Sequence, residues 1–149
     1  MILSQRTKKT RDIELWAWFV QNTEGPVPPP EFNDNGCTSS PDFMLGTGEA
    51  LWPPCRAHDY RYSGEHGDPD LTRAMADEWF YDDIVTCLRY QQRERETGWR
   101  ILLRPFNALR ARYYAHVYTE AVRKLGSRHF TPYVPPDPPD EPIALPRAA

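Results

Sequence analysis

The sequence predicts an all-α protein, one small helical domain followed by a proline-rich extended tail. The alternation of apolar and polar residues that is typical of strands is scarce, whereas four stretches between helix breakers have helical character. A length of 149 residues suits a single domain with a core of modest size. Of the 16 prolines, 11 fall in residues 26–30 and 132–146, and this composition builds neither helix nor sheet.

The folded unit is predicted to span residues 12–130, and the extended tail residues 131–149. Its first helix, over residues 12–21, is short and apolar, with Asp12 as a possible N-cap. A loop is expected over residues 31–52, because Asn-Asp-Asn-Gly, Thr-Ser-Ser-Pro and Gly-Thr-Gly follow one another there.

Two further helices are predicted on either side of a short turn. The first spans residues 53–64, opening on a pair of prolines and ending near Gly64. The second spans residues 69–91 and follows Asp68-Pro69, which has the order of an N-cap and a first-turn proline.

The last predicted helix spans residues 98–126, is interrupted or restarted at Pro105, and ends at Gly126. Segment 89–112 contains seven arginines, which we interpret as a solvated helix face; anionic lipid headgroups are the alternative partner. The tryptophans expected as core or half-buried anchors are Trp16, Trp18, Trp79 and Trp99.

Charge and hydropathy exclude two classes of function. A net charge of −3 argues against a general nucleic-acid binder, and no run approaches the ~20 apolar residues that span a bilayer. No obligate protein partner is evident. Residues 30–83 hold 12 acidic residues and three arginines, which suits a cation site or a solvated acidic face.

One acidic residue lies where an apolar residue is expected. At 100° per residue, Tyr81, Ile84 and Leu88 fall within about 40° of Asp77, so Asp77 is at the centre of the apolar stripe of its helix. A carboxylate that faces a core needs hydrogen bonds or positive charge. We therefore expect a histidine or tyrosines opposite it.

The preceding helix offers such partners, because His58 and Tyr62 are four residues apart and share a face. A buried carboxylate against His58 leaves the other imidazole nitrogen free, which is the arrangement of a histidine general base. A buried His–Asp hydrogen bond without catalysis is the alternative on spacing alone.

Two other carboxylates suit a hard cation. Asp42 lies in the predicted loop and Asp59 follows His58, and Ca²⁺ takes carboxylates together with backbone carbonyls from an irregular loop. The alternative is that Asp42 caps a turn and Asp59 is simply exposed.

Three segments together resemble the secreted phospholipase A2 family of bacteria and fungi. They are Asn35-Gly-Cys-Thr-Ser-Ser-Pro-Asp42, Cys55-Arg-Ala-His-Asp-Tyr-Arg-Tyr62 and Asp77-Glu-Trp-Phe-Tyr-Asp-Asp83. The family pattern is Cys-x-x-His-Asp followed by an aspartate on the next long helix, and the resemblance covers roughly residues 35–126.

The resemblance implies a calcium-dependent phospholipase A2, a carboxylic ester hydrolase acting on the sn-2 ester at a phospholipid membrane surface. His58 would activate water, Asp77 would hold the imidazole ring, and Tyr62 would support Asp77. The implied calcium ligands are Asp42, Asp59 and the backbone carbonyl of Phe43. The implied disulfide joins Cys37 to Cys55. The implied fold is centred on two antiparallel helices, with a calcium-binding loop beside them.

The third cysteine, the function and the location each leave alternatives open. Cys87 has no partner once Cys37 and Cys55 are joined, and we expect a buried free thiol. A zinc-binding module would instead use Cys37, Cys55, His58 and either Cys87 or His66; an inactive phospholipase relative is a third possibility. The family implies secretion, but no signal peptide is recognised in the sequence, so a cytoplasmic or virion-associated location is the alternative.

Overall fold

The computed structural model describes residues 8–33 and 49–136. Within these ranges every regular element is a helix, which confirms the all-α prediction. The α-helices are α1 (Lys8–Asn22), α2 (Trp52–Ser63), α3 (Arg73–Arg95) and α4 (Arg104–Leu125), and the 3-10 helices are η1 (Gly98–Leu103) and η2 (Gly126–Arg128). None of the described helices has the length and apolar character needed to span a bilayer.

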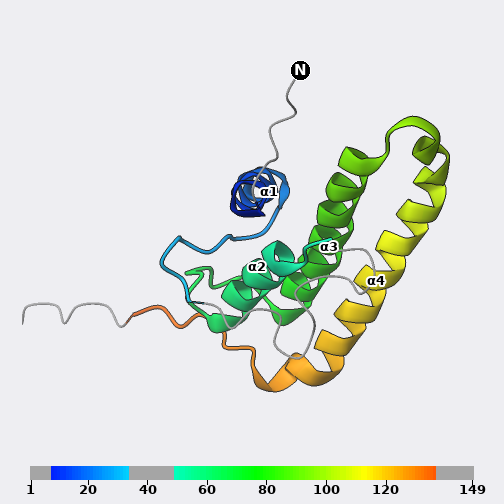
Figure 1. The fold of residues 1–149 in the computed structure, drawn as a ribbon. Coiled ribbons are helices and arrows are strands. Elements are labelled where there is room, and N and C mark those ends of the chain that lie inside the picture. The colour runs from blue at the N-terminus through cyan, green and yellow to red at the C-terminus, as the bar shows by residue number, and fades with distance from the viewer. Residues whose placement is uncertain (1–7, 34–48, 137–149) are drawn as a thin grey trace, which may run out of the picture.

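The helices pack in chain order (Figure 1). The two longest, α3 and α4, lie antiparallel along their length; α2 packs against α3, and α1 packs against α2. The main core lies between α2, α3 and α4 and contains Leu51, Cys55, Phe80, Ile84, Leu88, Ala111 and Ala115. This arrangement puts the facing sides of α2 and α3 near the middle of the molecule.

Helix α1 begins four residues before the predicted start. Its first turn is polar and gives no apolar signal, whereas Leu15 and Phe19, one turn apart, are buried. Trp16 stacks on Trp52 at 5.4 Å between ring centroids, and Trp18 stacks on Tyr90 at 4.0 Å. Aromatic contacts therefore hold α1 against α2 and α3.

Helix α2 lies within one residue of its prediction, with prolines at its first positions and Gly64 ending it at a φ of 77°. The start of α3 was predicted wrongly. Asp68 does not cap the helix, because its Oδ1 accepts a hydrogen bond from the backbone N–H of Asp70 at 2.9 Å in a turn. The N-cap is Thr72, whose Oγ1 accepts from the backbone N–H of Met75 at 3.3 Å.

The helix predicted over residues 98–126 is divided into η1 and α4, with Pro105 in the first turn of α4. Helix α4 ends at Leu125 with Gly126 as its C-cap, as predicted, although the φ of Gly126 is a right-handed −79° and the 3-10 helix η2 follows directly. The expectation that Trp99 is an anchor is wrong, since it is 71% exposed. Of the predicted tail, residues 131–136 are without regular structure and the remainder lies outside the described residues.

Candidate active site

His58 and Asp77 face each other across the α2–α3 contact. The Nε2 atom of His58 lies 3.3 Å from Oδ1 of Asp77, and the two residues are 5% and 2% exposed. Asp77 points inward because it occupies the apolar stripe of α3 between Ala76 and Phe80, which are both buried. The structure therefore contains the contact predicted from the sequence.

Tyr62 and Arg73 complete the surroundings of the Asp77 carboxylate. The Tyr62 hydroxyl donates to Oδ1 at 2.6 Å, and Nε of Arg73, one turn earlier on α3, lies 3.7 Å from Oδ2. Two hydrogen-bond donors and one nearby positive charge offset much of the loss of hydration of this buried carboxylate. Sequence reasoning found Tyr62 and missed Arg73, although its i, i+4 spacing from Asp77 is a usable signal.

Aromatic rings fix the orientation of the His58 imidazole. The ring lies between Tyr62 and Phe80, with centroid distances of 4.1 and 4.4 Å. In the described part of the chain, the hydrogen bond of this ring is the one at Nε2. Nδ1 is therefore the nitrogen that remains for proton transfer.

Burial and charge act in opposite directions on this cluster. Burial lowers the pKa of His58 below its ordinary 6.5, against the raising effect of the Asp77 hydrogen bond and charge. Burial raises the pKa of Asp77, but hydrogen bonds from His58 and Tyr62 and the charge of Arg73 together bring it below its usual value. Burial and the Asp77 carboxylate also raise the pKa of Tyr62. Near pH 7 the cluster thus holds a neutral imidazole and an ionised carboxylate.

The predicted calcium ligands are only partly placed. Asp59 is half-buried on α2 directly after His58, whereas Asp42 and Phe43 lie outside the described residues. Across residues 8–33 and 49–136, no three His, Cys, Asp or Glu side chains gather in a way that would hold a metal. The zinc alternative would need Cys55 and His58 to meet Cys87 or His66, so the described residues do not provide it.

Of the cysteines too, some lie among the described residues and one does not. Cys87 is a buried free thiol, as predicted, and burial raises its pKa. Cys55 is buried on α2, one turn before His58. Its predicted partner Cys37 lies outside the described residues, and the disulfide stays a prediction.

Sequence reasoning missed a second polar network one turn along α2. The guanidinium of Arg61 is completely buried and donates from Nη1 to Oδ2 of Asp83 at 2.7 Å, while the Thr23 hydroxyl donates to Oδ1 of Asp83 at 2.6 Å. Arg61 also donates to Oγ1 of Thr23 at 2.9 Å and to the carbonyl of Pro26 at 3.1 Å. The usable signal was the position of Arg61 three residues after His58, on the same side of α2.

No protein-family model, curated protein or solved structure matches this chain. The geometry of the site therefore carries the functional argument, together with the resemblance in its motifs.

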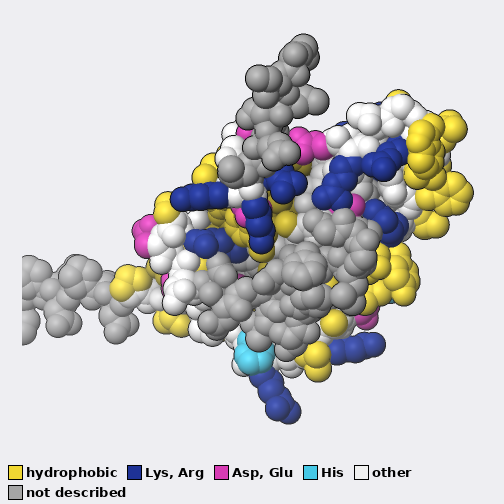
Figure 2. Space-filling model, in the orientation of Figure 1, with side chains coloured by type: hydrophobic (Ala, Val, Ile, Leu, Met, Phe, Trp, Pro, Cys, Tyr) yellow, Lys and Arg dark blue, Asp and Glu magenta, His cyan; other side chains and the backbone are white. Residues whose placement is uncertain are grey.

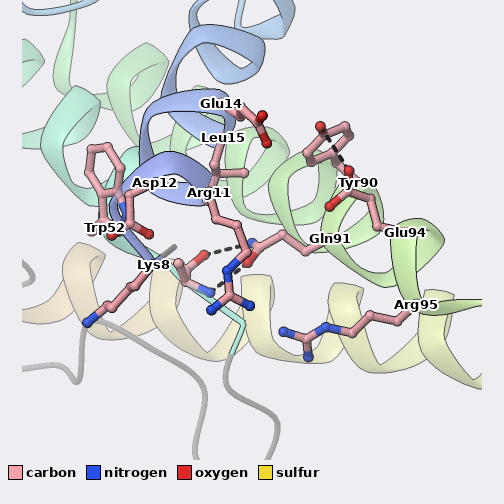
Figure 3. A pocket seen from close by; sticks show the side chains of 11 residues that line it. Lys8, Arg11, Asp12, Glu14, Leu15, Trp52, Tyr90, Gln91, Glu94 and Arg95 are labelled. Carbon is pink, nitrogen blue, oxygen red and sulfur yellow. Dashed lines mark hydrogen bonds between the residues drawn. The ribbon is translucent and has the colours of Figure 1, made fainter. Parts of the chain in front are cut away.

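The molecule also has a cavity of about 680 Å³ that His58 does not line (Figure 3). It lies between α1, the start of α2 and the second half of α3, with Lys8, Arg11 and Arg95 among its lining residues. Gln91 closes one side by pairing with the backbone of Ala50, at 2.8 and 2.9 Å. The cavity is thus separate from the His58–Asp77 contact.

Proposed function

We propose that this protein is a calcium-dependent phospholipase A2, which hydrolyses the sn-2 ester of glycerophospholipids to a fatty acid and a lysophospholipid. The observation that carries the proposal is the buried contact between His58 and Asp77, supported by Tyr62. A carboxylate held at Nε2 and a neutral imidazole with Nδ1 remaining are what water activation requires.

The reaction begins when Nδ1 of His58 accepts a proton from a water molecule and the water oxygen bonds to the ester carbonyl carbon. The Asp77 carboxylate stabilises the imidazolium that forms and keeps the ring oriented. When the tetrahedral intermediate collapses, the bond to the glycerol oxygen breaks and that oxygen receives the proton from His58. The products are the fatty acid and the lysophospholipid.

A calcium ion would supply a fixed positive charge for the developing oxyanion. Asp59 is the candidate ligand among the described residues, because its carboxylate follows His58 in the sequence and is half-buried. Asp42 and the carbonyl of Phe43 would supply further oxygens. A Cys37–Cys55 disulfide would fix that segment to α2.

The substrate and the implied family support a phospholipid membrane surface as partner and an extracellular location, with a cytoplasmic or virion-associated location as the alternative. A non-catalytic metal-binding module and an inactive relative are the competing functions. Release of fatty acid separates both from the enzyme, since neither cleaves an ester.

The test measures fatty-acid release from phospholipid vesicles by wild type, His58→Gln and His58→Ala, with Ca²⁺ or with EGTA. We expect release that needs Ca²⁺ and falls by at least about 10²-fold in both variants. His129→Ala is the matched control, because His129 is exposed outside the site. The proposal fails if folded wild type releases no fatty acid, if EGTA has no effect, or if His58→Ala keeps full activity.

A further inference from the structure

Helix α4 packs small residues and the half-buried Tyr114, Tyr118 and Val122 against the core, and presents other large apolar side chains to solvent. The buried residues of α4 are Ala111, Ala115 and Thr119. On the opposite side, large apolar residues of η1 and α4 are exposed, with Leu102 at 77% and Phe106 at 69%. This outer face of α4 is formed by Trp99, Leu102, Phe106, Leu109, Tyr113 and Val117. A contiguous exposed apolar face of this kind marks an interaction surface.

The exposed residues form one continuous line. Within α4, the spacings from Phe106 to Leu109, Tyr113 and Val117 are three, four and four residues, which keeps these four on one side of the helix. Leu102 lies in η1, directly before α4. Figure 2 shows hydrophobic side chains gathered at the edge of the molecule over the η1 end of α4. A line of this kind can bury its whole length against a single apolar surface.

The charge around the outer face is positive from η1 to Thr119, and the next residue, Glu120, pairs with Arg123 at 3.1 Å. Residues 97–119 contain four arginines and no acidic residue. Arg104 and Arg110 pair with Glu96 and Glu49 at 3.1 Å each. Arg100 and Arg112 are exposed and make no ion pair with any described residue. The surroundings of the apolar line therefore favour an anionic partner.

We infer that the outer face of α4 docks on an anionic phospholipid surface. The helix lies in the plane of the interface, with Leu102, Phe106 and Leu109 inserted among the acyl chains. Trp99 and Tyr113 occupy the headgroup level, where amphipathic rings are favoured. Arg100 and Arg112 reach the lipid phosphates while their stems cover apolar surface.

A second copy of this chain suits the face less well. A two-fold contact through α4 would bring the arginines of both copies together, and the acidic residue that follows segment 97–119, Glu120, already pairs with Arg123 at 3.1 Å. A lipid surface supplies both the apolar interior and the negative charge that this face lacks.

The inference deepens the proposed function and rests on it in one respect: phospholipase activity is the reason that the protein would bind a lipid surface. The outer face and the His58–Asp77 contact lie on different sides of the molecule, since Ala111 and Ala115 between them pack toward α3. Binding and hydrolysis can therefore be lost independently.

The test measures co-sedimentation of the full chain with vesicles of ether-linked phospholipids, which have no ester to cleave, either zwitterionic or with an added anionic lipid. We expect tighter binding to the anionic vesicles in the presence of EGTA. The double variant Leu102→Asn/Phe106→Asn should bind at least about tenfold more weakly. Arg112→Gln should weaken binding to anionic vesicles by about fivefold and leave zwitterionic binding unchanged.

The matched control is Ile13→Asn, which removes a 61% exposed apolar side chain from α1 and should leave binding unchanged. His58→Gln should bind as wild type; normal binding with no hydrolysis by any form of the protein would remove the proposed function and keep the docking face. The inference is overturned if the double variant binds normally, if zwitterionic vesicles bind equally well, or if wild type is a dimer that the double variant dissociates.

Discussion

Arg61 is the residue whose loss should destabilise the fold most specifically, and we expect Arg61→Met to show this. The substitution keeps an unbranched side chain of similar length and removes the charge. It breaks the 2.7 Å contact with Asp83 and the hydrogen bonds to Thr23 and Pro26, and leaves Asp83, which is 4% exposed, with Thr23 as its remaining partner in this network.

Removing one partner of a buried ion pair lowers the free energy of unfolding by about 3–5 kcal/mol, because the other charge stays buried and unpaired. For a chain of this size, about 2–4 °C of melting temperature corresponds to each kcal/mol, so the loss should be about 6–20 °C. Burial raises the pKa of Asp83, while the charge of Arg61 lowers it. Without Arg61 this pKa rises further, so the folded variant holds its proton to higher pH and is less destabilised in acid.

Urea unfolding monitored by tryptophan fluorescence measures the change, and a double-mutant cycle with Asp83→Asn isolates the pair. The double variant should lose clearly less than the sum of the two single variants, because no uncompensated charge remains. Gly25→Ala should also disturb the packing around Arg61, because the added Cβ would lie 2.6 Å from Nε of Arg61. A loss below about 1 kcal/mol for Arg61→Met, or additive single losses, would refute the reasoning.

Four further outcomes are expected. Because burial lowers the pKa of His58, wild-type kcat/KM should fall with acidification only through a midpoint below pH 6.5; a midpoint above it in a pH-stat assay would contradict the assigned base. Asp77→Asn should lower kcat by about 10²–10⁴-fold and move that midpoint to lower pH, because the charge that raises the His58 pKa is gone, whereas the exposed control Asp82→Asn should do neither. Asp59→Asn should raise the Ca²⁺ concentration needed for half-maximal fatty-acid release by at least about tenfold, and an unchanged requirement would remove Asp59 from the ligand set. Thr72→Ala should lower the free energy of unfolding by about 1 kcal/mol through loss of the α3 N-cap, measured by urea unfolding, and a neutral result would place the helix start elsewhere.

The sequence predicted the helices of this protein well and their ends less well. Helix α2 was bounded correctly because prolines and Gly64 act through local backbone geometry. The start of α3 was missed because Asp68-Pro69 serves a turn as well as it serves a helix, and Leu71, 4% exposed, fixes the chain before the helix begins. The local sequence is compatible with both a turn and a helix start at Asp68, and tertiary packing decides in favour of the turn.

Part of the candidate site could likewise be predicted from the sequence and part could not. The contact of His58 with Asp77 could be predicted because a carboxylate in an apolar stripe requires a donor and the neighbouring helix had one at the right spacing. The Arg61–Asp83 pair could not, because Asp83 lies away from the centre of that stripe and its partner Thr23 belongs to a connection with no periodicity. Trp99 was misassigned because composition cannot tell a core aromatic from one that faces a partner.

The two polar networks of α2 together fix how α2 sits on α3. His58 and Tyr62 meet Asp77, and Arg61 meets Asp83 six residues further along α3. A shift of α2 by one turn would break these contacts and leave Asp77 with Arg73 and Asp83 with Thr23 as partners, at a cost above that of rearranging apolar contacts. We therefore expect the Arg61 network to help hold α2, and with it His58, in place on α3. The charge of Arg61 lowers the pKa of His58 and that of Asp83 raises it. Where the protein remains folded, Arg61→Met should therefore move the acid limb of the pH–rate profile to higher pH, and Asp83→Asn should move it to lower pH in the same assay.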